Sequence, residues 1–460
     1  MKQAREGNQT FKRRYVLKPS PLHIRVLSSQ ANSLWGFLVL LWFSGFMLIV
    51  LTAYSNYKLD KEFIGTYLMH LSMSNFIEVF LFDTLLILAT VFSFFLQKLI
   101  VLRWIPLRVG AFLQRVYELA LIGYSNWYLY QQNWNWASSG ALCMHTISIL
   151  FKMHSYNIVN RRLFEQQELL KELEGSLKKC DDSDVEAITE QINEIKSVLT
   201  IKVPTNIEFS EGCKTPEFSE ANDLLVTYPA NVTFNNYLEY LIFPTLIYDI
   251  AFPRMKNIRW WFIFEKMIEF VGTMFCLYVT MENYIIPQFL DQTNSFIDLL
   301  VITSSPFMIC MLLTFNIIFE IICNVCAELT RYGDRNFYSD FWNSTSYLEF
   351  SRKWNKPVHN FLFRHVYVEC YYVLGFSKNV ARIMTFFISS LFHELLFVVV
   401  FKELKWYMFV IQMFQIPLIA FQELPAIKKY PVAGNMFFWF GMYIGVPLLC
   451  VAYNRDIWFV

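Results

Sequence analysis

The chain alternates between long apolar runs and shorter polar stretches along most of its length. A run of about 20 apolar residues is long enough to cross a bilayer as a helix, and the hydropathy pattern predicts about nine such helices. They lie near residues 34–54, 79–101, 116–131, 136–151, 262–281, 299–327, 383–401, 406–423 and 433–453. The third and fourth runs are short and rich in Trp, Tyr and Asn, so re-entrant or interfacial helices are the alternative there. The sequence therefore predicts an all-α polytopic membrane protein.

The long polar section after residue 151 carries a helical pattern of its own. Leu, Ile and Val recur at heptad-like spacing over 161–200, on both sides of the break "CDDSD" at 180–184. This spacing predicts a helical hairpin, which either contacts a partner or lies solvated on its own protein. Residues 203–236 have Pro, Asn, Ser and Thr without periodicity, which predicts an irregular linker.

Basic residues are unevenly distributed and orient the predicted helices. The first 30 residues hold seven Lys and Arg against one acidic residue, which places the N-terminus in the cytosol by the positive-inside rule. The next four helices then return the chain to the cytosol for the polar section. The loop at 282–296 has no Lys or Arg and is expected in the lumen, whereas 331–382 has eight and is expected in the cytosol.

These patterns divide the chain into four parts, and its composition agrees with a membrane protein. The parts are a basic cytosolic N-terminal segment (1–33), N-terminal transmembrane helices (34–151), a cytosolic helical hairpin with its linker (152–257) and a C-terminal transmembrane region that carries the candidate chemistry (258–460). Hydrophobic residues make up 55% of the chain and aromatic residues 18%, which is more than soluble domains of this length carry.

Metal, redox and nucleic-acid chemistry find little support in the sequence. Cys323 and Cys326 form a C-x-x-C pair, but they lie in an apolar helix pattern without a second pair, so packing explains them better than metal or redox chemistry. No His, Cys, Asp and Glu group has metal-ligand spacing, and we expect no metal. The basic, aromatic segment 331–382 suits a ligand with an anionic end and a greasy end, because its place between membrane helices argues against nucleic acid.

His393 and Glu394 interrupt the apolar run "MTFFISSLFHELLFVVVF" at 384–401. An ionisable residue within a membrane helix is costly, and it therefore points to function. Apolar surroundings keep an imidazole neutral and able to accept a proton, as a general base must. A packing histidine that bonds a neighbouring carbonyl or Glu394 is an equally good reading of these residues. Ser389, one turn earlier on the same face, is available to a substrate or to the backbone.

Three motifs in a fixed order resemble the membrane-bound O-acyltransferase family, in its branch of acyl-CoA:cholesterol and diacylglycerol acyltransferases. They are "FYSDFWN" at 337–343, "RKWNKPVHNFLFRHVY" at 352–367 and "SSLFHEL" at 389–395. The first motif departs from the usual pattern, since Phe341 stands where a Trp is expected and an indole N–H donor is lost. The resemblance covers most of the chain after about residue 150. "FKMHSYN" at 151–157 and the run from residue 384 onward are most similar to fungal sterol O-acyltransferases.

The resemblance implies the fold of this family and transfer of a long-chain acyl group from acyl-CoA to the 3β-hydroxyl of a sterol. It implies His393 as the general base and Asn355 as the second catalytic residue, which either orients the acceptor or donates to the developing oxyanion. His359 and Trp354 match positions beside them, and Pro357 predicts that a helix starts between Asn355 and His359. Glu394 and Ser389 are expected in support.

The resemblance also implies how the donor is held. Arg352 and Lys378 are expected at its phosphates, with Tyr338, Trp342 and Asn343 lining or bracing the donor tunnel. Acyl-CoA is a substrate, and because its thioester is already activated no cofactor is required.

Further expectations concern partners and place: sterol and membrane lipid as partners, a homodimer or higher homo-oligomer, the endoplasmic reticulum membrane, and no nucleic acid. Three alternatives stay open. Diacylglycerol is the rival acceptor, and a transporter or a non-catalytic scaffold would be a protein of another class.

Overall fold

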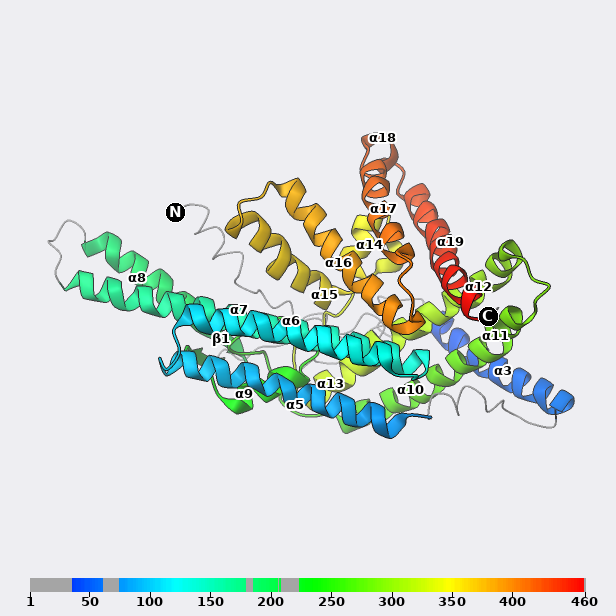
Figure 1. Ribbon diagram of the computed structural model, residues 1–460, viewed down its shortest axis with the longest axis horizontal. Helices are drawn as coiled ribbons and strands as arrows, with labels where there is room; N and C mark the ends of the chain where they lie inside the picture. Colours follow the sequence, from blue (N-terminus) through cyan, green and yellow to red (C-terminus); the bar gives the residue numbers. More distant parts are fainter. Residues whose placement is uncertain (1–34, 61–73, 179–184, 206, 208–222, 459–460) are drawn as a thin grey trace.

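The described part of the chain folds mostly into helices (Figure 1), in a computed structural model that describes residues 35–60, 74–178, 185–205, 207 and 223–458. The predicted basic N-terminal segment 1–33 lies outside these residues. The helices and strands are α3 (Trp35–Asp60), α5 (Phe76–Val101), α6 (Leu107–Gln131), α7 (Trp136–Leu177), α8 (Val185–Leu199), β1 (Thr200–Pro204), β2 (Asp223–Thr227), α9 (Phe234–Ile242), α10 (Trp260–Thr280), η2 (Met281–Ile285), α11 (Ile286–Leu290), α12 (Phe296–Phe315), η3 (Asn316–Ile322), α13 (Cys323–Leu329), η4 (Phe341–Asn343), α14 (Tyr347–Lys353), α15 (Lys356–Leu362), η5 (Phe363–Tyr367), η6 (Glu369–Val373), α16 (Lys378–Phe401), α17 (Tyr407–Gln422), α18 (Pro425–Lys428) and α19 (Pro431–Trp458).

Each apolar run predicted to cross the membrane falls on a helix. Among the described residues, four helical stretches are long and apolar enough to cross a bilayer: Phe76–Val101, Phe296–Leu329, Lys378–Phe401 and Pro431–Asn454. The count of nine crossings and their orientation stay predictions. Helix α7 continues without a break through residue 151, where the sequence predicted the boundary between membrane and cytosol.

Helix α8 packs against the C-terminal half of α7, where the sequence predicted two paired helices (Figure 1). Its buried residues Ile192, Ile195 and Leu199 recur at helical spacing and form one apolar face. Leu163 of α7 lies in the same hydrophobic cluster as Ile195 and Leu199. The location of this helix pair in the cytosol stays a prediction.

A small sheet occupies part of the region that the sequence predicted as an irregular linker. Strands β1 and β2 pair antiparallel, with Thr200 opposite Thr227 and Pro204 opposite Asp223. The all-α prediction is therefore wrong for this segment. Each strand has only five residues, and so short a run carries too little alternation to be recognised.

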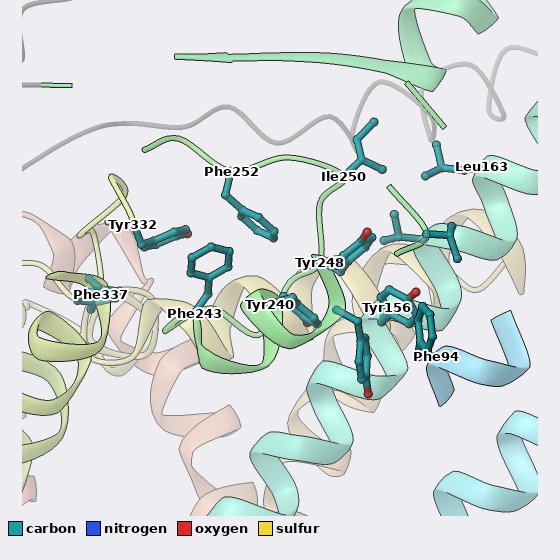
Figure 2. Packing of buried hydrophobic residues seen from close by; sticks show 14 of the residues in the cluster. Phe94, Tyr156, Leu163, Tyr240, Phe243, Tyr248, Ile250, Phe252, Tyr332 and Phe337 are labelled. Carbon is teal, nitrogen blue, oxygen red and sulfur yellow. The ribbon is translucent and has the colours of Figure 1, made fainter. Parts of the chain in front are cut away.

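The largest hydrophobic cluster is rich in aromatic residues, and we call it the aromatic core (Figure 2). It joins α7 and α9 to the loop before α10 and to the loop after α13. Tyr156 meets Tyr237 and Tyr248 edge-on, with ring centroids 4.7 and 4.8 Å apart, a favourable aromatic geometry. The buried Tyr237 hydroxyl donates to the carbonyl oxygen of Thr90 at 2.8 Å. The core includes residues that follow α13, and it therefore holds the first motif against the rest of the protein.

The outer faces of the long helices are apolar. Large hydrophobic side chains on α5, α10, α12 and α19 are exposed, among them Ile77, Val271, Ile297 and Met436. So many exposed apolar residues on adjoining helices exceed what a soluble surface carries. They are the side chains that a bilayer would cover.

Candidate active site

His393 lies in the middle of α16, half-buried, with its ring nitrogen Nδ1 bonded to the backbone of the same helix. Nδ1 is 2.8 Å from the carbonyl oxygen of Ser389, one turn earlier. A carbonyl oxygen only accepts, so the geometry assigns the proton to Nδ1 and leaves the Nε2 lone pair as an acceptor. The bond to a carbonyl is the one expected of a packing histidine, and the free Nε2 is the acceptor that a general base needs. Ser389 thus supports His393 through its backbone.

Glu394, the next residue, accepts hydrogen bonds from the neighbouring helices. It is 2% exposed, and its carboxylate accepts from the backbone N–H groups of Trp406 at 2.8 Å and Phe409 at 3.0 Å. The hydroxyl of Tyr453 in α19 donates to it at 3.2 Å. The first N–H groups of α17 have no partner within their own helix, and Glu394 satisfies two of them. Its observed bonds therefore dock α17 and α19 on α16.

Asn355 is the N-cap residue of α15, with Pro357 in the first turn, which confirms the predicted helix start. Its Oδ1 accepts from the backbone N–H of Val358 at 3.1 Å, a standard cap interaction. With Oδ1 engaged, the side chain still has its Nδ2 group, which donates to no residue in the described part of the chain. The cap thus holds Asn355 so that it can act as a hydrogen-bond donor.

His359 follows one turn after Asn355, and its backbone N–H donates to the Asn355 carbonyl at 2.9 Å. Burial holds the pKa of His359 below its ordinary value, and the nearby cations Arg352 and Lys356 act in the same direction. A base with a lowered pKa is neutral at physiological pH. His359 therefore adds no positive charge beside Asn355.

Aromatic packing brings the helix of Asn355 next to the helix of His393. The Phe151 ring of α7 stacks on Phe361 of α15, with centroids 4.1 Å apart, and meets Phe392 of α16 edge-on at 5.1 Å. Val358, which precedes His359, packs on the same cluster. α16 contacts α7 and also η5, which continues the helix of α15, and Figure 1 shows this helix running beside α16. Two motifs about 40 residues apart thus lie on neighbouring helices.

Trp354, which precedes Asn355, packs against three aromatic rings. Its ring centroid lies 4.4 Å from that of Phe315, 4.7 Å from Phe341 and 5.3 Å from Phe350. Phe341, which replaces the usual Trp of the first motif, is 3% exposed. Ring packing is therefore retained at this position, although the indole N–H is absent.

The three residues expected at the donor tunnel differ in their surroundings. Tyr338 is 1% exposed, and its hydroxyl donates to Glu320 Oε2 at 2.6 Å. Trp342 is half-buried, and its carbonyl oxygen accepts from Trp439 Nε1 of α19 at 3.1 Å. Asn343 is exposed. Tyr338 thus lies in the interior, whereas Trp342 and Asn343 are accessible in part or in full.

The two cations expected at the donor phosphates are both exposed. Arg352 lies in the last turn of α14, and Lys378 is the first residue of α16. The Lys378 ammonium lies 5.9 Å from the centroid of the Tyr371 ring. In the described residues, no group of three or more His, Cys, Asp or Glu side chains lies close enough to hold a metal ion.

Sequence reasoning missed Glu320, Asn435 and Trp439. Asn435 Nδ2 donates to the carbonyl oxygens of Trp342 at 3.0 Å and Ser344 at 2.8 Å. Together with Trp439 it fastens the first motif to α19. Glu320 could have been found by the signal that identified His393, a charged residue inside an apolar run, but the contacts from α19 had no sequence signal.

Gly434 allows α19 to lie directly against the segment after the first motif. A Cβ atom here would lie 2.7 Å from the backbone oxygen of Thr345, whereas a Cβ on Gly445 of the same helix meets nothing within 4 Å. We expect Gly434→Ala to destabilise the protein by about 1–3 kcal/mol through overpacking. Gly445→Ala should be neutral or slightly stabilising. Thermal unfolding midpoints in detergent test this, and equal midpoints for the two variants would contradict the close approach.

Comparison with known proteins finds a family and several relatives to which this chain is similar. The model of the membrane-bound O-acyltransferase family matches residues 36–454. Sterol O-acyltransferase 2 of Saccharomyces uvarum is 33% identical over 419 residues, which are 86% of this chain and 62% of that protein. Probable sterol O-acyltransferase 2 of Schizosaccharomyces pombe is 30% identical over 458 residues, which are 95% of this chain and 90% of that protein.

A relative named for another acceptor is also similar, over a shorter stretch. Diacylglycerol O-acyltransferase 1C of Glycine max is 32% identical over 245 residues, or 51% of this chain and 47% of that protein. The chain spans 62% of the length of the Saccharomyces uvarum relative. Since the family match extends over nearly all of the described residues and includes all three motifs, the chain belongs to the membrane-bound O-acyltransferase family.

Proposed function

We propose that this protein transfers a long-chain fatty acyl group from acyl-CoA to the 3β-hydroxyl of a sterol. The observation that carries the proposal is the 2.8 Å contact between His393 Nδ1 and the Ser389 carbonyl oxygen, which assigns the proton to Nδ1 and leaves Nε2 to accept one. A half-buried acceptor nitrogen inside an apolar helix suits the activation of a hydroxyl group on a membrane lipid.

In the proposed reaction, His393 Nε2 takes the hydroxyl proton as the sterol oxygen attacks the thioester carbonyl carbon. The new C–O bond forms, the C–S bond breaks, and the thiolate of coenzyme A leaves with the proton that His393 returns. The products are a steryl ester and free coenzyme A. The thioester supplies the driving force, so the task of the protein is to bring the two reactants together away from water.

Asn355 acts as a donor to the oxygen of the thioester carbonyl as negative charge develops there. Its Oδ1 is occupied by the helix cap, which favours this role over acceptance of a hydrogen bond from the sterol. His359 and Trp354 flank Asn355, and the exposed cations Arg352 and Lys378 receive the phosphates of the donor. Trp342 and Asn343 line the donor path.

The relatives favour sterol over diacylglycerol as the acceptor. The two yeast proteins named for sterol align over 86% and 95% of this chain, whereas the soybean protein named for diacylglycerol aligns over 51%. The proposal includes sterol and membrane lipid as partners, a homodimer or higher homo-oligomer, and residence in the endoplasmic reticulum membrane with a cytosolic N-terminus. A transporter or an inactive scaffold would not require the His393 tautomer.

Acceptor choice can be tested in cells that lack neutral-lipid acyltransferases. Their membranes, with this chain expressed, would receive labelled oleoyl-CoA together with sterol or diacylglycerol. We expect label in steryl ester at a rate at least about tenfold above that in triacylglycerol, the discrimination of a site built for one acceptor. Label mainly in triacylglycerol would show that diacylglycerol is the acceptor. No transfer from folded protein would favour the transporter and scaffold alternatives.

A further inference from the structure

A buried ionic group lies between α10 and the π-helical segment η3. Lys266 is 5% exposed and Glu320 is 1% exposed. Lys266 Nζ lies 2.7 Å from Glu320 Oε1 and 2.8 Å from Glu269 Oε2, and Asn316 Nδ2 donates to Glu269 at 3.0 Å. Buried charges are costly unless they are paired and fully hydrogen-bonded. The partners therefore hold Glu320 in one place.

Glu320 also binds Tyr338 of the first motif. Its second oxygen accepts from the Tyr338 hydroxyl at 2.6 Å, and a charged acceptor makes such a bond strong. The Tyr338 ring meets Phe315 edge-on at 5.0 Å, and Phe315 in turn packs on Trp354. Tyr338 is thus fixed at its hydroxyl and at its ring.

The backbone on both sides of Tyr338 is bonded to the backbone on both sides of Asn355. The Phe337 carbonyl accepts from the Lys356 N–H at 3.0 Å, and the Ser339 N–H donates to the Lys353 carbonyl at 2.9 Å. Two hydrogen bonds that bracket both residues allow little independent movement. The backbone around Tyr338 is therefore tied to the backbone at the start of α15.

We propose that Glu320 and Tyr338, held by Lys266, are positioning residues that set the place of Asn355 against the thioester. This role rests on the proposed function, because Asn355 matters only where an acyl group is transferred. None of the three residues is required to touch a substrate. A displacement of about 1 Å at a catalytic group lowers rates by up to roughly 100-fold. Loss of the Glu320–Tyr338 hydrogen bond should therefore have a large effect on the reaction.

Tyr338→Phe removes only the hydroxyl that reaches Glu320, and Tyr237→Phe is its matched control. Tyr237 is an equally buried tyrosine of the aromatic core whose hydroxyl bonds Thr90 instead. We expect Tyr338→Phe to lower kcat about tenfold with little change in the KM for acyl-CoA, and Tyr237→Phe to stay within about twofold of wild type. Equal losses in the two variants would overturn the proposal.

A double-mutant cycle separates positioning from general stabilisation. Asn355→Asp keeps an oxygen for the helix cap but has no amide donor. In that background, we expect Tyr338→Phe to change kcat by less than about twofold, because the group that it positions is already missing. A tenfold loss in both backgrounds, which is the additive result, would show that Tyr338 does not act through Asn355.

Hydrogen–deuterium exchange gives a readout that does not depend on activity. The Lys356 amide should exchange faster in Tyr338→Phe than in wild type, and at the wild-type rate in Tyr237→Phe. Unchanged exchange in Tyr338→Phe would overturn the positioning role even if the enzyme is active. A wild-type protein that transfers no acyl group would overturn the proposed function. Faster exchange of the Lys356 amide in Tyr338→Phe would in that case still support the positioning of this segment by Tyr338.

Discussion

We expect His393→Ala to lower the rate of steryl ester formation by about 1,000-fold, within the range that a general base contributes. Without the imidazole, no group in the proposed reaction takes the proton from the attacking hydroxyl. Alanine also fits α16 without strain, because it is the best helix former. The rate is measured with labelled oleoyl-CoA on membranes that contain equal amounts of folded protein.

A histidine on another helix provides the control. His145 of α7 pairs with Asp83 and has no part in the proposed reaction. We expect His145→Ala to keep the rate within about threefold of wild type, because the partly exposed pair that it removes has no part in the reaction. If His393→Ala retained more than about a tenth of the wild-type rate, general base catalysis by this residue would be ruled out.

Two substitutions at Asn355 separate its structural role from its chemical one. Asn355→Asp keeps an oxygen for the Val358 N–H but removes the Nδ2 donor, whereas Asn355→Ala removes both. Loss of one oxyanion donor lowers kcat by about 100- to 1,000-fold, so both variants should be impaired to this degree. Only Asn355→Ala should also lose stability, by about 1 kcal/mol for the missing cap.

The two readouts are kcat from the labelled assay and the thermal unfolding midpoint in detergent. A near wild-type kcat for Asn355→Asp would mean that the amide donor is not used. A lower midpoint for Asn355→Asp than for Asn355→Ala would contradict the cap as the structural role of the side chain.

The sequence was sufficient for the parts of the site that depend on local pattern. His393 stands out because an ionisable group in an apolar run is costly, although a packing role explained it equally well. Pro357 indicated where α15 begins, because proline fits the first turn of a helix. The apolar runs located the long helices, since their length is set by the thickness of the bilayer.

Contacts between distant segments could not be predicted in this way. Glu394 bonds residues 12, 15 and 59 positions away, and no periodic pattern links these positions. The role of Asn355 was suggested only by the resemblance, because a cap and a catalytic amide look alike in sequence. The sheet of β1 and β2 escaped notice because its strands are short and lie in a stretch rich in loop-forming residues.

The most direct test uses the purified chain in lipid nanodiscs with sterol and labelled oleoyl-CoA, so that no other acyltransferase contributes. We expect steryl ester to form in proportion to the amount of wild-type protein, with free coenzyme A released in equal amount, and to fall to background with His393→Ala. Folded wild-type protein that yields no steryl ester, or an equal yield from His393→Ala, would contradict acyl transfer to sterol by this site.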